Sequence, residues 1–347
     1  MTPLLTCDGL RVHFPVRGGV MLRQTGAVRA VDGVSLSIQP GETLGLVGES
    51  GCGKSTLGKA LVRLIKPTSG KIVFQNTDIT HASQSALRPL RRDIQMIFQD
   101  PAESLDPRMS VRAIIEEPYI IHRLGTRAER NKWVNELLER VGLPASSAER
   151  YSFEFSGGQR QRIGIARALA LKPKLIICDE PVSALDVSVQ SQILNLLVEL
   201  QKDFGLSYLF IAHDLSVVKH VSDRVAVMYL GKIVELAGSE TIYQDPRHAY
   251  TRALLSAIPS TDPTARRAKI LLEGDVPSPI DPPAGSAFGH RINHPRYEET
   301  IGADLSLREI VPNHWVAADP CSVSAEDWNQ LQPSGAATVA VVAPRLE

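Results

Sequence analysis

The segment GESGCGKST at residues 48–56, directly after the apolar run Leu44–Val47, most constrains how this chain can fold. Its spacing, Gly48-x-x-x-x-Gly53-Lys54-Ser55, is the complete P-loop pattern. Glycines let the backbone curl without Cβ clashes, so several N–H groups can converge on phosphate oxygens. A helix opening near Lys54 adds the positive end of its dipole. The segment therefore predicts a strand, a phosphate-binding loop and a helix, in that order.

Each part of this loop has an expected role. Lys54 is expected to reach the terminal phosphates of a nucleotide, and the Ser55 hydroxyl to bind Mg²⁺. The apolar spacing of Leu57, Leu61, Leu64 and Ile65 predicts an amphipathic helix to about Ile65, which disfavours a merely structural glycine turn. The residues assigned to nucleotide binding are Gly48, Glu49, Ser50, Gly51, Cys52, Gly53, Lys54, Ser55 and Thr56.

Composition narrows the class of protein. Lys+Arg and Asp+Glu both total 38, so the formal net charge is zero, which disfavours a nucleic-acid partner. The four cysteines are widely spaced, which indicates neither a disulfide framework nor a zinc site and favours the cytosol. No apolar run is long enough to cross a bilayer, so the polypeptide is not expected to enter a membrane by itself.

Strands and helices alternate along much of the chain. Leu4–Ile38 is expected to be strand-rich around a loop at Arg17–Gly26, and Val111–Tyr151 has helical periodicity. The apolar runs in KLIICDE, LSYLFIAHD and DRVAVMYL are separated by helical segments, which predicts a parallel α/β sheet. From Pro259 onward proline is frequent and periodicity weak. This predicts a loosely built C-terminal region, and its composition allows disorder past Pro333.

Two carboxylates end the strand of LIICDE. In a P-loop fold we expect this strand beside the first one, so that Asp179 binds Mg²⁺ through water. Glu180 is then placed to orient or deprotonate the attacking water. Gln99, after the apolar MIF, is a candidate ligand of Mg²⁺ and water, and His213 is a candidate contact of the γ-phosphate.

A second glycine-rich stretch, FSGGQRQR at residues 155–162, opens another predicted helix. It looks like an anion-binding helix N-terminus but has no lysine arranged as in the P-loop. One polyphosphate rarely needs two such cradles. This cradle is therefore predicted to serve a nucleotide held by another chain.

Together, the segments at 48–56, Gln99, FSGGQ, LIICDEPVSALD and His213 resemble an ATP-binding cassette (ABC) ATPase in type and order. They are similar to its Walker A, Q-loop, signature, Walker B with D-loop, and switch histidine. The resemblance covers about Leu4–Gly238. It implies an α/β P-loop NTPase: a RecA-like parallel sheet, an antiparallel β portion and an inserted α-helical subdomain at about 101–166. We expect an ATPase domain at 1–238 and an irregular C-terminal extension at 239–347.

The same resemblance implies site roles. Two cassettes would sandwich two ATP molecules head to tail, with Asp186 communicating between the sites. Residues completing the partner's site would be Ser156, Gly157, Gly158 and Gln159; catalytic residues Glu180, His213 and Gln99; and Mg²⁺ ligands Ser55, Gln99 and Asp179.

Finer features resemble the dipeptide/oligopeptide importer branch: AVDGVSLSI, FQDPAESLDPRM and YQDPRHAYTRALLSAIP. This implies an ATP-hydrolysing, energy-coupling subunit peripheral to the cytoplasmic face of the inner membrane. Its expected partners are a second ABC ATPase, two transmembrane permease subunits and an extracytoplasmic solute-binding protein. Peptides lead as cargo; nickel, opines and other small solutes are alternatives. A nucleic-acid-associated cassette is a remote alternative, since this chain lacks the tandem cassettes and zinc insertions typical of that class.

Two departures from that branch matter. Many relatives hold an iron–sulfur centre on clustered cysteines, but PPAGSAFGHRINHPRYEE contains none, and Cys321 alone cannot ligate a cluster. No iron–sulfur cluster is therefore expected. No adenine-stacking aromatic stands directly before AVDGVS either; Arg29 occupies that neighbourhood, and Phe14 is the nearest upstream aromatic.

Overall fold

The computed structural model describes residues 2–18, 23–258, 270, 272 and 274–331. The chain divides into two compact units. The first comprises Met1–Gln39, Thr43–His81 and Ala212–Glu347, and the second comprises Pro40–Glu42 and Ala82–Ile211. The division thus falls inside the expected ATPase domain, and the C-terminal region belongs to the first unit. The prediction that the chain can be disordered past Pro333 concerns residues outside those that the structure describes.

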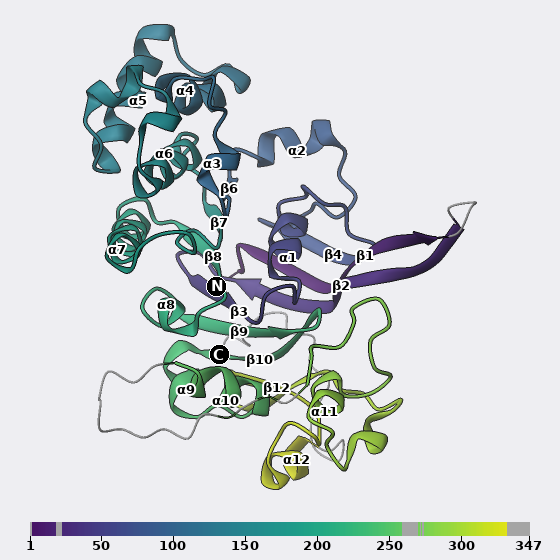
Figure 1. The fold of residues 1–347 in the computed structure, drawn as a ribbon. Helices are drawn as coiled ribbons and strands as arrows, with labels where there is room; N and C mark the ends of the chain where they lie inside the picture. The colour runs from purple at the N-terminus through teal and green to yellow at the C-terminus, as the bar shows by residue number, and fades with distance from the viewer. Residues whose placement is uncertain (1, 19–22, 259–269, 271, 273, 332–347) are drawn as a thin grey trace, which may run out of the picture. The chain divides into compact units, whose positions relative to one another are not determined.

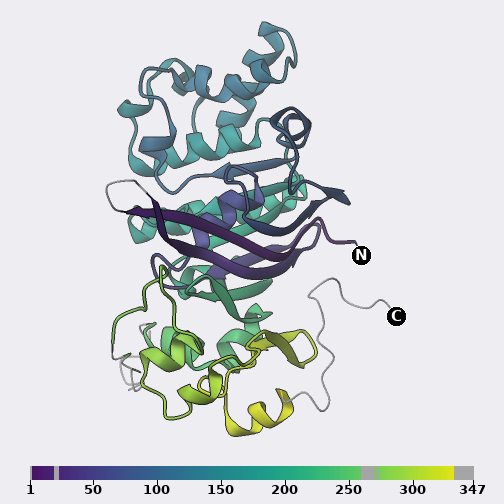
Figure 2. The same ribbon diagram turned by 90° about the vertical axis from the view of Figure 1, so that its right-hand side faces the viewer.

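An antiparallel sheet opens the first unit (Figure 2). Strands β1 (Leu5–Gly18) and β2 (Arg23–Ile38) pair along their length, and β4 (Ser69–Phe74) with β5 (Thr77–Asp78) continues the sheet beyond β1. The expected loop at Arg17–Gly26 is wrong at its ends, because the ladder continues there: Val16 pairs with Gly26 and Gly18 with Arg23. Residues 19–22, between the strands, lie outside the description.

The P-loop strand of the first unit is β3 (Thr43–Val47), which pairs in parallel with β9 (Arg224–Tyr229). The antiparallel strands β10 (Lys232–Gly238), β12 (His314–Ala317) and β11 (Leu307–Val311) follow in that order. The expectation of a loosely built C-terminal region is therefore wrong where β11 and β12 continue this sheet. The local sequence lacks a strong period because both strands are short and β11 lies at the edge of the sheet.

Helix α1 (Lys54–Leu61) follows the P-loop and packs on β1 and β2. Leu57 and Leu61 are fully buried, as their spacing predicts. The helix ends four residues before the expected Ile65, because Arg63 takes a left-handed backbone conformation with φ 58°. Leu64 is consequently 53% exposed instead of joining the core.

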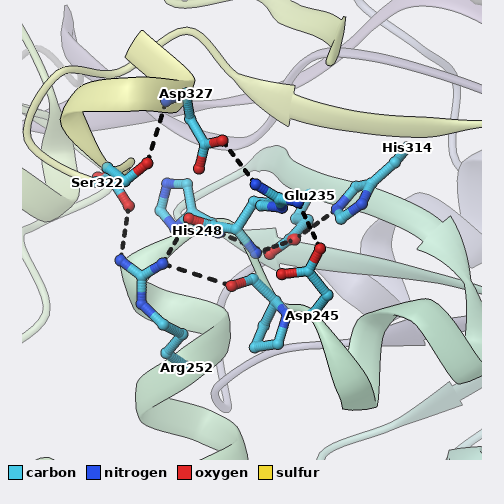
Figure 3. Close-up of polar contacts among 10 residues, drawn as sticks. Glu235, Asp245, His248, Arg252, His314, Ser322 and Asp327 are labelled. Carbon is cyan, nitrogen blue, oxygen red and sulfur yellow. Dashed lines mark hydrogen bonds and ion pairs between the residues drawn. The ribbon is translucent and has the colours of Figure 1, made fainter. Parts of the chain in front are cut away.

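Short helices complete the first unit: α8 (Leu215–Lys219), α9 (Ser239–Gln244), α10 (Ala249–Ser256), α11 (Ala287–Arg291), η3 (Tyr297–Thr300) and α12 (Ala325–Leu331). A polar network around the buried Glu235 ties α10 and α12 to β10 (Figure 3). The fully buried Glu235 carboxylate accepts from His314 Nε2 at 2.8 Å and from the backbone N–H groups of Arg247 and His248. Arg247 in turn donates to Asp327 of α12 at 2.8 Å. Because a buried carboxylate needs such donors, Glu235 fixes the start of α10 to the sheet, and Arg247 extends the network to α12.

The second unit contains the parallel strands β6 (Ile94–Ile97), β7 (Leu175–Asp179) and β8 (Ser207–Ala212). Strand β7 pairs with β6 on one edge and with β8 on the other. The expectation that the strand of LIICDE lies beside the P-loop strand is therefore wrong, because both edges of β7 are taken by other strands. All residues of β7 and β8 are buried, which explains their unbroken apolar sequence.

Helices dominate the rest of the second unit (Figure 1). They are α2 (Gln84–Leu90), α3 (Pro101–Ser104), α4 (Val111–Ile121), α5 (Arg127–Arg140), η1 (Ala145–Glu149), η2 (Ser152–Glu154), α6 (Gly157–Leu169) and α7 (Val187–Phe204). Helices α4, α5 and α6 contact one another, and Tyr119 packs its ring 5.0 Å from that of Trp133. The helical periodicity expected over Val111–Tyr151 is thus confirmed for α4 and α5, whereas after Arg140 the segment forms only the short η1, and Tyr151 bridges to Ser110.

Candidate nucleotide-binding and catalytic site

Close backbone approach explains two glycines of the P-loop. A Cβ on Gly48 would lie 2.1 Å from the carbonyl oxygen of Met228 in β9, and one on Gly53 would lie 1.9 Å from that of Ala30 in β2. Gly53 also has φ 108°, which other residues rarely adopt. The loop is therefore pressed between two strands and can take only glycine at these positions.

Lys54 folds back over the loop that precedes it. Its side chain is buried, and Nζ donates to the carbonyl oxygens of Gly48 at 2.7 Å and Glu49 at 2.9 Å. The ammonium therefore lies inside the curl of the loop, where the pattern places the terminal phosphates. Ser55 and Thr56 follow in the first turn of α1, at the positive end of its dipole. Cys52 is buried, and burial raises the pKa of its thiol, so this position contributes backbone and not a reactive side chain.

The second unit carries the carboxylates. Asp179 ends β7 and is only 2% exposed, while Glu180 follows with φ 45°, a strained value for a residue with a side chain. The Glu180 N–H donates to the carbonyl oxygen of Ile211 at 3.0 Å, which fixes this turn against the end of β8. Gln99 Nε2 donates to Glu180 Oε2 at 3.2 Å. The fold thus brings together Gln99 and Glu180, which are 81 residues apart in sequence.

His213 belongs to the first unit, as does the P-loop. It is exposed and lies between β8 and α8, where Asp214 caps the helix by accepting from the Ser216 N–H at 2.7 Å. The predicted site residues therefore divide: residues 48–56 and His213 in the first unit, and Gln99, Asp179 and Glu180 in the second.

The second glycine cradle forms the start of α6. Ser156 and Gln159 make a capping box, in which the Ser156 hydroxyl accepts from the Gln159 N–H and the Gln159 side chain accepts from the Ser156 N–H. Ser156 and Gly157 are exposed, whereas a Cβ on Gly158 would lie 2.4 Å from Val189 in α7. The cradle is thus built and accessible. The apolar face predicted for this helix is buried: Ile163, Ile165, Ala166, Ala168 and Leu169.

A small cavity and the exposed Asp186 are two further features of the second unit. A cavity of about 100 Å³ lies where Gln99, Gly157, Arg160 and Leu185 converge. Asp186 stands exposed before α7. The cavity links the segment after Gln99 with the signature helix inside one unit.

Two residues in contact with the P-loop were missed by the sequence reasoning. The Tyr250 hydroxyl accepts from the Glu49 N–H, and Arg291 forms an ion pair with the Glu49 carboxylate. The segment YQDPRHAYTRALLSAIP, which contains Tyr250, was the available signal, but nothing local connects it to the P-loop. No signal marked Arg291.

A phosphate loop, a strand ending in two carboxylates beside a glutamine, and a separate capped cradle define an ABC-type ATPase. The ABC transporter family model matches residues 31–183, and the model for the oligopeptide/dipeptide transporter C-terminal region matches residues 234–295. The chain belongs to the ABC transporter ATP-binding proteins of the oligopeptide/dipeptide transporter family. It is an ABC transporter ATPase, and its cassette binds ATP.

Relatives support this membership along nearly the whole chain. The oligopeptide transport ATP-binding protein AppF of Bacillus subtilis is 54% identical over 90% of this chain and 96% of its own length. The putative oligopeptide transport ATP-binding protein YkfD of the same organism is 52% identical over 91% of this chain and 94% of its own.

Solved structures show the same fold. A dimeric post-hydrolysis structure of the ATP-binding cassette MJ0796, bound to ADP and Pi, aligns with a TM-score of 0.61 at 29% identity, covering 68% of this chain and 98% of that one. The structure of cbiO1 from Clostridium perfringens, part of the cbiONQ ABC transporter complex, aligns with a TM-score of 0.61 at 29% identity, covering 71% and 92%. Within the part of the chain that the structure describes, no helix is both long and apolar enough to cross a membrane.

Proposed function

We propose that this chain is the ATP-hydrolysing, energy-coupling subunit of an importer for dipeptides or oligopeptides. The observation that carries the cargo class is the match of residues 234–295 to the oligopeptide/dipeptide transporter C-terminal region. The relatives named for oligopeptide transport support it over about nine-tenths of the chain. Nickel, opines and other small solutes are the alternative cargoes.

The proposed chemistry is ATP hydrolysis by the predicted site residues. Residues 48–56 bind the phosphates of ATP, Glu180 accepts a proton from the attacking water, and Gln99, bonded to Glu180, orients that water. His213 contacts the γ-phosphate. ATP binding favours the closed dimer over the open one. This preference is how ATP can drive the conformational change of transport.

Mg²⁺ fits the oxygen donors that these residues offer. The Ser55 hydroxyl, the Gln99 side-chain carbonyl and the Asp179 carboxylate are hard oxygen ligands of the kind that Mg²⁺ prefers. We propose that they hold the ion, directly or through water. When bound, it neutralises negative charge on the phosphates.

The expected partners match features of the second unit. The exposed cradle around Ser156 fits a nucleotide held by a second ATPase, with Asp186 communicating between the two sites. Four apolar side chains of the helical subdomain are 44–62% exposed: Ile120, Ile121, Tyr151 and Phe153. Tyr151 and Phe153, whose ring centroids lie 5.7 Å apart, form an exposed apolar pair that supports docking onto transmembrane subunits. The chain would then be peripheral, on the cytoplasmic face of the membrane, with a solute-binding protein on the other side.

Transport by the assembled complex tests this function. The complex that co-purifies with the tagged chain is reconstituted into vesicles, and uptake of a labelled tripeptide and of ⁶³Ni²⁺ is measured beside ATP hydrolysis. We expect tripeptide uptake that requires ATP and is lost in Lys54→Ala. Uptake of nickel but not of the tripeptide would show that the cargo is nickel and not a peptide.

A further inference from the structure

Glu49 of the P-loop is bonded to the C-terminal region through both its backbone and its side chain. Its N–H donates to the Tyr250 hydroxyl at 2.9 Å, and Arg291 donates to its carboxylate Oε2 at 2.7 Å. Its carbonyl oxygen accepts from Lys54 Nζ at 2.9 Å. Glu49 therefore joins Lys54 to Tyr250 and Arg291, which lie 201 and 242 positions after Glu49 in the chain.

The Tyr250 hydroxyl is held in a fixed place. Its ring is fully buried, with the centroid 4.7 Å from that of Tyr229 in β9 and 5.6 Å from that of Phe288 in α11. Helix α10 starts at His248, whose Nδ1 accepts from the Tyr250 N–H and whose own N–H donates to the buried Glu235. The hydrogen bond to Glu49 is thus anchored to the sheet core and not to a loose segment.

Arg291 supplies the charge that Glu49 requires. Its side chain is 8% exposed and also donates through Nε to the carbonyl oxygen of Gly274 at 3.2 Å. A carboxylate within a phosphate-binding loop repels the phosphates unless a cation compensates it, and the repulsion is stronger where water is partly excluded. The Glu49 side chain is 29% exposed, so Arg291 is its close and shielded partner.

We propose that Tyr250 and Arg291 are positioning residues for ATP binding, which hold Glu49 so that the P-loop is preorganised and its one carboxylate is neutralised. The C-terminal region of this family member would therefore set the affinity of the cassette for ATP. The proposal rests on residues 48–56 being the site of the ATP phosphates, and it does not depend on which solute is transported.

Equilibrium binding of ATP to the isolated full-length chain tests the proposal. Arg291→Met leaves the Glu49 carboxylate uncompensated, so we expect the Kd for ATP to rise about tenfold, as for loss of a charge-assisted hydrogen bond. Arg291→Lys keeps the charge and should restore most of the affinity. Tyr250→Phe removes one neutral hydrogen bond and should raise the Kd by about threefold.

A double variant separates this positioning role from a general structural one. Adding Glu49→Gln to Arg291→Met removes the repelling charge, so ATP should bind more tightly to the double variant than to Arg291→Met alone. Loss of fold predicts the opposite order, because two changes would add their damage. Thermal unfolding without nucleotide is recorded for every variant to compare their stability.

Matched controls lie in the same region but away from the P-loop. Arg308, 13% exposed, donates to Asp304 and to the carbonyl oxygen of Leu331, and Tyr297 packs against His290. Arg308→Met and Tyr297→Phe should leave the Kd for ATP unchanged. Wild-type affinity in folded Arg291→Met, an equal loss in Arg308→Met, or no recovery in the double variant would each overturn the proposal. If these Kd shifts are observed but the complex does not transport peptides, only the proposed cargo is refuted, and the role of Tyr250 and Arg291 stands.

Discussion

At the scale of single residues, Glu180 has the strongest case for the chemical step. Its backbone is held at φ 45° by the bond to Ile211, and its carboxylate meets Gln99. Such strain persists only where the surroundings over-determine it, and it clusters at functional sites. The preceding Asp179 is buried, so the two adjacent carboxylates have different environments, which suits a metal ligand beside a base.

We expect Glu180→Gln to keep ATP binding and to slow hydrolysis by roughly 10²–10⁴-fold, the usual contribution of a general base. Binding survives because the P-loop is in the other unit and unchanged. ATP affinity of the isolated chain and turnover by the assembled transporter check this. The control is Glu199→Gln, which makes the same carboxylate-to-carboxamide change at an exposed position of α7. Turnover near the parent rate in Glu180→Gln would remove this residue from the mechanism.

Phe14 and Arg29 are the two candidates for the residue that stacks on adenine. Phe14 is 40% exposed and pairs across the ladder with Val28, two residues before Ala30, whose carbonyl abuts Gly53 of the P-loop. Arg29 points to the opposite face of β2 from Val28, since successive side chains alternate. The ladder therefore places the exposed ring of Phe14 in β1, next to the strand β2 that borders the nucleotide loop.

We expect Phe14→Ala to raise the Kd for ATP about tenfold, within the roughly 1–3 kcal/mol that base–aromatic stacking contributes. Competition by inorganic tripolyphosphate should be unchanged, because that ligand has no base. Arg29→Ala is measured alongside. If Arg29→Ala weakens ATP binding and Phe14→Ala does not, the guanidinium and not the ring carries the adenine contact.

At the scale of elements, the start of α10 makes stability depend on pH. His248 is fully buried, and burial lowers its pKa to about 4 despite the nearby charges of Asp319 and Glu235, with Arg252 acting in the same direction as burial. In the unfolded chain its pKa is about 6.5. Between these values the unfolded state binds a proton that the folded state does not. Stability therefore falls as the pH falls from about 6.5 to 4, by about 1.4 kcal/mol per pH unit from this group.

His248→Asn should flatten that dependence. Asparagine keeps an acceptor for the Tyr250 N–H, as a good N-cap residue, but does not titrate. Urea unfolding of both proteins at pH 7, 6 and 5 gives the two slopes. An unchanged slope in the variant would assign the acid sensitivity to other groups.

For the whole molecule, the proposal that the second cradle serves a nucleotide held by a partner makes one chain an incomplete enzyme. The capped N-terminus of α6 exposes Ser156 and Gly157 within a unit that does not contain the P-loop. We expect Ser156→Arg to leave ATP binding by the isolated chain intact, because residues 48–56 are unchanged. Hydrolysis by the paired cassettes should fail, since bulk and charge would stand where the opposing γ-phosphate binds.

ATP affinity of the monomer is compared with activity of the assembled pair. The exposed Ser85→Arg in α2, which has no assigned role, controls for general effects of surface charge. Activity of the wild-type chain should also rise with its concentration or on adding a partner, as mass action requires. Loss of monomer ATP binding in Ser156→Arg would mean that both cradles serve one nucleotide, and the head-to-tail sandwich would be wrong.

The local features of the candidate site can be predicted from the amino-acid sequence. The P-loop glycines, the apolar strand ending at Asp179 and Glu180, and the capped start of α6 are each written in short stretches, because each depends on backbone conformation or period within one element. The class of ATPase followed from their order. The close approach of Met228 and Ala30 to the loop explains Gly48 and Gly53, but the pattern predicted these glycines without it.

Only the tertiary structure decided how distant segments meet. Strand β7 has β6 and β8 as its neighbours, α1 ends at Leu61, and β11 with β12 extends the sheet, none of which a local period encodes. The contacts of Tyr250 and Arg291 with Glu49 join residues more than 200 positions apart. Tyr250 is held in place because His248, the N-cap of its helix, is bonded to the buried Glu235 of β10. Such pairings depend on packing between elements and not on the sequence within any one of them.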